Sequence, residues 1–384
     1  MLRTQKLITI FANGYKTNLH MPKEFIHPGL LLDKLLNERD LSQRDLASRI
    51  DIAHSLLNSI LKGSRNINVN IAIALESAGF KTANHWLTKQ MQYNLELAQK
   101  DEEVIKKKKS IKIWNEMEQI VPLTYFKRQV SKINSSDDIK EIYNIYDVID
   151  FHGLKNKIEN FSPTYFRKSS KFVENKNNVL AWSLLAEYRL KNEMVKEFSR
   201  HNKDALVKEL NECFYKNDNV INKSKKILNK YGIKFLILDR PSQTPVDGKS
   251  FMSNDNPAIA LSLKYKRIDN FAFTLFHEIG HVFEHLTNPK KPEYRDAQFF
   301  INSSSNTEIV EFEADKYAIE NLIDVNLFND FIVINDEYSD DSIIKFSKKN
   351  KVHPGIVRGR VCYLHNEYYR KRSSITLLNK LKSI

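Results

Sequence analysis

Two histidines and a glutamate in the C-terminal half of the chain have a spacing that suits metal chemistry. His277 and His281 are four residues apart, and Glu278 directly follows the first histidine. On a helix, residues i and i+4 share one face about one turn apart, so both imidazoles can reach a single ion. Glu278 then lies about 100° round the helix, where it can take a proton from water that the metal activates. The pattern predicts a zinc site and therefore a metallopeptidase.

The helix that carries these residues is predicted to be largely buried. Apolar residues recur from Phe271 to Phe283, and we expect Asp269 or Asn270 to cap its start. Two imidazoles without partners would be unfavourable in such a helix, which favours a metal site over two core histidines. His285 continues the series one turn on. We expect it at the surface, because a fourth ligand would close the position that a catalytic zinc keeps open.

A third zinc ligand is expected on a second helix further along the chain. Glu311 and Asp315 share one face of that helix at i and i+4. A catalytic zinc takes three protein ligands, so Glu311 is assigned as the third. Asp315 is placed to accept a hydrogen bond from a histidine ring, a support that such ligands usually have. Glu313 points elsewhere and is the second choice as ligand.

Short strands are predicted ahead of the metal helix. Residues 233–238 form an apolar run typical of a buried strand, and residues 241–248 are rich in turn formers. A short strand at 251–252 and a third at 257–263 follow. The third strand could bind an extended peptide by edge pairing.

The first hundred residues show a helical rhythm. A helix follows Pro28-Gly29 with Leu30, Leu31, Leu35 and Leu36 on one face, Ser42 caps a second, and a third runs from about Ala53 to Leu61. Gly63 ends the third helix. Further helices are predicted at 70–78 and 84–98.

Composition limits the class of protein. The net charge is +13 and the pI about 9.3, which suits a nucleic-acid partner without establishing one. The lysine run 106–109 is expected to be a solvated helix face. Two distant cysteines, Cys213 and Cys362, fit a reducing, cytoplasmic setting. No apolar run is long enough to span a membrane.

The metal motif and its surroundings resemble the ImmA/IrrE family of metallopeptidases. The stretch 269–281, the segment 311–318, and the lead-in formed by Tyr165 to Ser169 and Trp182 carry the resemblance, which covers about half the chain. It implies a zinc-dependent, gluzincin-like fold with His277, His281 and Glu311 as ligands and Glu278 as general base. Members are linked to cleavage or inactivation of repressor proteins in mobile elements or stress responses.

The N-terminal region resembles the HigA-type antitoxins, which carry an XRE-like helix-turn-helix. The matching stretches are 27–29, 41–47 and 58–63, with 86–97 as the closing helix. The turn before the third helix has Asp51 where the family commonly has Gly, and Asp tolerates a left-handed conformation. In such a fold the third helix enters the major groove. The residues expected to face DNA are Gln43, Ala53, His54, Ser55, Asn58, Lys62 and Arg65, the last two at phosphates.

Together these predictions indicate an α+β fold that is mostly α. We expect an XRE/HigA-like helix-turn-helix domain at 21–100, a helical connector at 101–220 and an ImmA/IrrE-like zinc metallopeptidase domain with a small sheet at 221–384. A turn and a basic helix follow His353, a residue that could lie near the metal.

Two functions from different classes remain open. The favoured one is a DNA-binding regulatory zinc metallopeptidase that cleaves a repressor or an antitoxin-type protein. The alternative is a HigA-like repressor or antitoxin whose zinc domain senses or binds a partner without cleaving it. Operator DNA, a protein substrate, a toxin partner and a homodimer are the expected partners.

Overall fold

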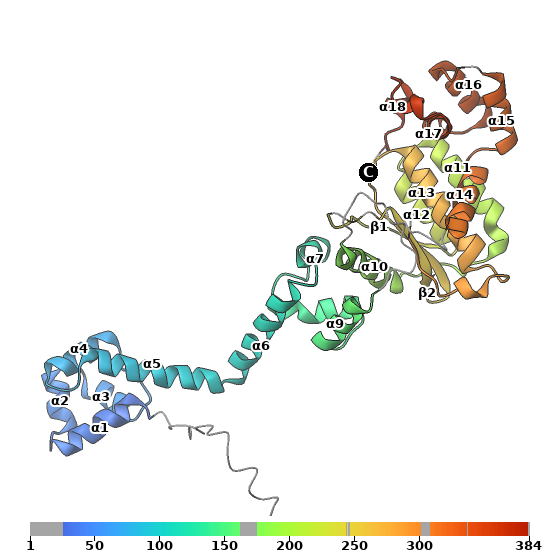
Figure 1. The fold of residues 1–384 in the computed structure, drawn as a ribbon. Helices are drawn as coiled ribbons and strands as arrows, with labels where there is room; N and C mark the ends of the chain where they lie inside the picture. Colours follow the sequence, from blue (N-terminus) through green and yellow to red (C-terminus); the bar gives the residue numbers. More distant parts are fainter. Residues whose placement is uncertain are drawn as a thin grey trace, which may run out of the picture. The chain divides into compact units, whose positions relative to one another are not determined.

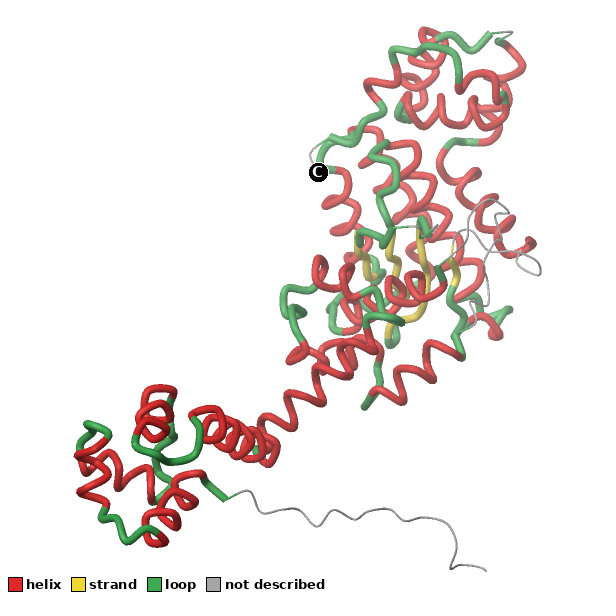
Figure 2. Tube along the Cα trace, turned by 60° about the vertical axis from the view of Figure 1, so that its left-hand side comes forward, coloured by secondary structure: helices red, strands yellow, loops and turns green. Residues whose placement is uncertain are grey.

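The chain divides into two compact units. The computed structural model describes residues 26–161, 175–242, 244, 246–300, 308–335 and 337–382, and the units are Met1–Lys109 and Ser110–Ile384 (Figure 1). Strands lie in the second unit alone among the described residues, and the rest of both units is helix and loop (Figure 2). The expectation of a mostly helical protein with a small sheet is confirmed. The predicted boundaries at residues 100 and 220 stay predictions, as does the peptidase fold.

The first unit is a bundle of short helices. They are α1 (Pro28–Glu38), α2 (Gln43–Arg49), α3 (His54–Leu61), α4 (Val69–Ser77) and α5 (Ala83–Lys100), after which α6 (Glu102–Met117) leads into the second unit. The Ser42 side chain caps α2 by accepting from the Asp45 amide. Asp51 between α2 and α3 has φ +51°, the left-handed conformation that the sequence predicts. Gly63, at φ +74°, follows α3.

The core of this unit fixes how α1 meets α3. Leu32 and Leu36 of α1 are buried together with Leu57 and Ile60 of α3. The predicted apolar face of α1 was wrong for Leu30, which is 48% exposed. It lies two residues before Leu32 on a helix, so the two cannot share a face.

The second unit begins with helices that continue from α6, whose lysines 106–109 are exposed as expected. These elements are α7 (Leu123–Gln129), η1 (Ser136–Asp138), α8 (Ile139–Tyr146), α9 (Phe151–Glu159), α10 (Lys176–Lys191), η2 (Arg200–Asn202), α11 (Lys203–Lys216) and α12 (Val220–Lys230). The remaining helices are α13 (Ile268–Gly280), η3 (His281–Leu286), η4 (Pro292–Tyr294), α14 (Glu308–Leu322), α15 (Val325–Ile334), α16 (Asp340–Asn350), α17 (Pro354–Leu364), η5 (Asn366–Tyr369) and α18 (Ile375–Leu378). None of the helices within the described ranges is both long and apolar enough to cross a membrane.

The described strands form one four-stranded sheet in the order β1-β3-β2-β4. They are β1 (Lys234–Ile237), β2 (Gly248–Ser253), β3 (Asn256–Leu261) and β4 (Phe299–Phe300). β1 is parallel to β3, whereas β2 is antiparallel to both β3 and β4. The predicted pairing of a peptide with the strand at 258–263 was wrong, because β3 is hydrogen-bonded to β1 on one side and to β2 on the other.

Alternate residues of β3 pack into two hydrophobic clusters on opposite faces of the sheet. Ile259 and Leu261 join a cluster with residues of α13, and Ala260 joins another that includes Trp182 of α10. This alternation follows from the two-residue period of a strand. The Trp182 indole N–H donates to the Leu238 carbonyl at 3.0 Å, which ties α10 to the end of β1. The metal helix therefore rests on a sheet that is covered on both faces.

Two helices of the second unit approach unusually closely. A Cβ on Gly280 of α13 would lie 3.0 Å from the Ala314 Cα of α14. α13 begins at Ile268 with Arg267 at the N-cap position, so the prediction that Asp269 or Asn270 caps this helix was wrong, and both residues lie in its first turn. α13 also ends at Gly280, and the next six residues continue as the π-helical turn η3.

Gly29→Ala is expected to destabilise the first unit by about 1–3 kcal/mol. A Cβ there would overlap the Ile60 carbonyl oxygen, a backbone atom of α3. Hydrogen exchange of the α1 and α3 amides measures the loss. The control is Gly153→Ala, whose Cβ would meet its nearest atoms at an ordinary 3.5 Å. Equal amide protection in wild type and Gly29→Ala would contradict the close packing.

Candidate metal centre

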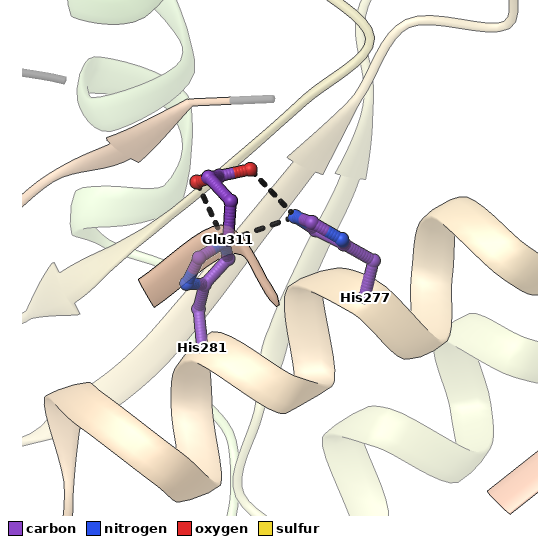
Figure 3. Close-up of side chains that lie close together, drawn as sticks. All are labelled: His277, His281 and Glu311. Carbon is purple, nitrogen blue, oxygen red and sulfur yellow. Dashed lines mark hydrogen bonds and ion pairs between the residues drawn. The ribbon is translucent and has the colours of Figure 1, made fainter. Parts of the chain in front are cut away.

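Three side chains from α13, the π-helical turn η3 and α14 converge on one point. His277 lies on α13, His281 opens η3 and Glu311 lies on α14 (Figure 3). Glu311 places one carboxylate oxygen 3.3 Å from His277 Nε2 and the other 3.4 Å from His281 Nε2. The two Nε2 atoms are 3.0 Å apart. One ligand atom from each residue lies within 4.8 Å of the others, so the structure brings the predicted ligand set together.

The outer nitrogen of each histidine contacts a further side chain. Asp315 Oδ1 lies 2.8 Å from His277 Nδ1, as the sequence predicts. His281 Nδ1 lies 3.2 Å from His285 Nδ1. The expectation that His285 is a surface residue was wrong, since its side chain is fully buried.

Glu313 completes this second chain of contacts. Its carboxylate lies 2.8 Å from His285 Nε2 and receives the Lys291 ammonium at 2.7 and 2.9 Å. The geometry does not support Glu313 as a metal ligand, the second choice of the sequence analysis. Glu313 lies two residues after Glu311 and thus faces His285 instead.

These contacts fix which nitrogen carries the proton when the rings are neutral. A carboxylate only accepts, so Asp315 selects the Nδ1–H form of His277. Glu313 likewise selects the Nε2–H form of His285, whose Nδ1 must then accept from His281. Both ligand histidines are left with a lone pair on Nε2, facing the Glu311 carboxylate. Three acceptors at one buried point require a cation, so the donor set fits zinc.

The pKa values reflect the same demand for positive charge. Burial by itself would lower the pKa of His277, but its hydrogen bonds with Asp315 and Glu311 raise it to about 10. Burial lowers the pKa of His281 to about 4. Burial would raise the pKa of Glu311, yet both histidines hold it at about 2. A proton on His277 thus takes the place of the metal, and metal binding must displace it.

The π-helical turn η3 directs two of the histidines. The Thr287 amide donates to the Val282 carbonyl five residues earlier, at 3.1 Å. The buried Phe299 ring of β4 stacks on His281 with centroids 4.6 Å apart and an interplanar angle of 7°. Such turns are rare and frequently occur at functional sites. The wider turn and the stacking ring together hold His281 toward Glu311.

Glu278 is a fully buried carboxylate beside this cluster. The Ser250 hydroxyl of β2 donates to Oε2 of Glu278 and lies 3.0 Å from its backbone carbonyl oxygen. Oε1 accepts no hydrogen bond from the described residues. Gly248 leaves room for it, because a Cβ there would overlap this oxygen. Burial raises the pKa of Glu278 to about 8, a value suited to proton transfer near neutral pH.

The residues predicted to face DNA lie in and around α3. Ala53, His54 and Ser55 are exposed at the start of α3, and Asn58 is half-buried one turn on. Gln43 opens α2 and donates from Nε2 to Asp33 Oδ1 at 3.3 Å. Lys62 and Arg65 are exposed after α3. Arg44 and Arg49 of α2, which were not predicted to face DNA, are exposed as well.

Two further predictions concern His353 and the segment 165–169. His353 caps α17, where its Nδ1 accepts the Gly355 amide at 3.0 Å. Burial lowers the pKa of His353 to about 4, so it serves α17 as a neutral acceptor. The lead-in at 165–169 lies outside the described residues.

Comparisons with known proteins match the first unit. A helix-turn-helix family model, HTH_3, matches residues 32–82. Virulence-associated protein I of Dichelobacter nodosus is 32% identical over 81 residues, which are 21% of this chain and 75% of that protein. The short helices and these matches define a helix-turn-helix protein. Through its first unit the chain belongs to the HTH_3 family.

Solved structures of antitoxins are also similar in sequence. Pseudomonas aeruginosa antitoxin HigA with the higBA promoter is 34% identical, covering 19% of this chain and 80% of that one, with a TM-score of 0.18. An addiction module antidote protein of a HigA family from Coxiella burnetii is 28% identical, covering 25% and 94%, with a TM-score of 0.19. The family assignment rests on the sequence matches alone.

His285→Ala is expected to weaken zinc binding by about 10–100-fold, because it frees the outer nitrogen of His281. Competition with a chromophoric chelator measures the zinc affinity. Glu284→Ala is the control, since that neighbouring side chain is partly exposed and pairs with Lys203 at 3.7 Å. Unchanged affinity in His285→Ala would show that His285 does not position the ligand.

Proposed function

We propose that this chain is a DNA-binding regulatory zinc metallopeptidase that cleaves a repressor or an antitoxin-type protein. The observation that carries the proposal is the convergence of His277, His281 and Glu311 beside the buried Glu278. The resemblance to ImmA/IrrE peptidases adds the substrate class. A stress, mobile-element or toxin–antitoxin setting, the cytoplasm and a homodimer belong to the same proposal.

The residues divide the chemistry between them. His277, His281 and Glu311 would hold the zinc, which supplies a Lewis acid that polarises a carbonyl and lowers the pKa of water. Glu278 accepts a proton from water at the free Oε1 and passes it to the leaving amine. Ser250 holds the other oxygen of Glu278 and so fixes the direction in which Oε1 points. Asp315 and His285 contact the outer nitrogens of the ligand histidines and so leave Nε2 of each ring facing the metal position.

The first unit is proposed to bring this activity to operator DNA. Its family supports DNA binding, because the second helix of a helix-turn-helix reads the major groove. Here that helix is α3, with His54, Ser55 and Asn58 toward the bases. Lys62 and Arg65 are proposed phosphate contacts, and neither has an acidic partner among the described residues.

A second function is a repressor or antitoxin that binds a partner without cleaving it. The family matches favour it, because they fall on the first unit. A toxin partner belongs to this alternative. It predicts operator binding that is indifferent to Glu278 and no cleavage of any protein encoded nearby.

The metal and the base are tested with two variants. Wild type and Glu278→Gln should each contain about one zinc per chain, because Glu278 is not a ligand, and His277→Ala should contain little. Wild type alone should cleave the repressor encoded nearby. Metal analysis and gel assays of that repressor give the readouts. Zinc-free wild type would contradict the site, and cleavage by Glu278→Gln would contradict the base.

DNA binding is tested at the two proposed phosphate contacts. Lys62→Ala and Arg65→Ala should each weaken operator binding about uniformly across sequences and reduce the slope of log K against log salt by about one. Fluorescence anisotropy at several salt concentrations measures both. Lys34→Ala on α1 is the control, since that ammonium faces Glu38 at 3.9 Å. If the slopes of all variants equal that of wild type, the assigned face is wrong.

A further inference from the structure

A pocket lies beside the metal centre, in the groove between α13, α14 and α17. Its volume is about 520 Å³, within the range of about 300–1,000 Å³ that is usual for small-molecule sites. Phe273 of α13 and Asp315 of α14 form part of its wall. Asp315 is also the residue that holds His277, so the pocket and the metal centre share one side chain.

Most of the pocket wall is apolar. Phe273 faces aliphatic side chains of α14 and α17, among them Ile319, Leu322 and Ile356. Tyrosines 363 and 369 add aromatic surface near its rim, and both are exposed. Such a wall favours a ligand with an aromatic or branched aliphatic body.

The charged groups of the wall leave one cation without an acid. Arg267 forms a two-bonded ion pair with Asp269, and Asp315 is bonded to His277. Arg360 of α17 has no carboxylate within ion-pair distance among the described residues. Its guanidinium lies 5.8 Å from the centre of the Phe328 ring, a contact that leaves its positive charge uncompensated.

The surroundings of Arg360 add to the attraction for an anion. Arg360 is half-buried, and burial lowers its pKa. A second hollow shares Arg267 and Tyr369 with the pocket, and its wall holds Arg358, Lys371 and Arg372 against the one carboxylate of Asp340. These cations raise the potential next to the pocket, which a negatively charged ligand would lower.

We propose that this pocket binds a small organic acid with an apolar body, whose carboxylate pairs with Arg360. A guanidinium takes a carboxylate through two parallel hydrogen bonds, and a partly buried site strengthens them. A free aromatic or fatty acid and the C-terminal residue of a peptide present the same chemistry. The proposal does not depend on peptidase activity, because the lining residues that define it are not metal ligands.

The test compares acids with their neutral amides on the full-length chain. Isothermal titration uses 3-phenylpropionate, octanoate and N-acetylphenylalanine, each beside its amide. At least one acid should bind about tenfold or more tightly than its amide. Tighter binding of 3-phenylpropionate or octanoate indicates a metabolite-like ligand, and tighter binding of N-acetylphenylalanine indicates a peptide terminus. No binding by any acid, or equal binding of acids and amides, would overturn the proposal.

Variants locate the binding. Arg360→Gln should remove the preference for the acid and leave amide binding unchanged, whereas Arg360→Lys should retain part of the preference. Arg370→Gln, an exposed arginine outside the pocket, is the matched control and should match wild type. Ile319→Trp should fill the pocket and weaken acid and amide alike. An acid that binds at the metal centre instead would be indifferent to Arg360→Gln, and that result would refute the assignment.

Discussion

The close packing of α13 on α14 sets the position of each residue in the metal centre. Gly280 has no side chain, so the backbone of α13 can approach Ala314. The two helices run antiparallel, since His281 meets Glu311 and His277 meets both Glu311 and Asp315. A larger residue at 280 would separate the helices, and the Glu311 carboxylate would then no longer span both imidazoles. The pocket beside Arg360 lies further along the same groove, so it depends on the same approach.

The centre depends on a balance between partly buried carboxylates and positive charge. Glu311, Asp315 and Glu313 contact three histidines, and the Lys291 ammonium at the outer end brings a permanent positive charge. In a low-dielectric interior this excess of acceptors is unfavourable unless a proton or a metal ion joins it. The raised pKa of His277 and the proposed affinity for zinc are therefore two expressions of one electrostatic requirement.

The sequence was informative where a single period or spacing decides the outcome. The i, i+4 spacing placed His277 on one face with His281 and Glu311 on one face with Asp315, and the left-handed Asp51 followed from its turn. The errors have a common physical cause. His285 was expected at the surface because a fourth ligand would close the open position of the zinc, and only the tertiary contacts show that it is buried between His281 and Glu313 instead. Ser250 and Gly248 were missed, because contacts between a strand and a distant helix leave no local pattern.

Glu278 bears on the choice between a peptidase and a binding protein. It is fully buried, and its Oε1 accepts no hydrogen bond from the described residues. An unpaired buried acceptor costs about 1–3 kcal/mol, and a domain that only held a partner could avoid this with an apolar side chain. The fold also provides a place for the carboxylate, since Gly248 leaves space for one oxygen and the Ser250 hydroxyl donates to the other. A buried carboxylate that is kept in an unfavourable environment by the residues around it is typical of groups that take part in a reaction. The environment of Glu278 therefore favours the enzymatic proposal, even though the family matches concern the DNA-binding unit.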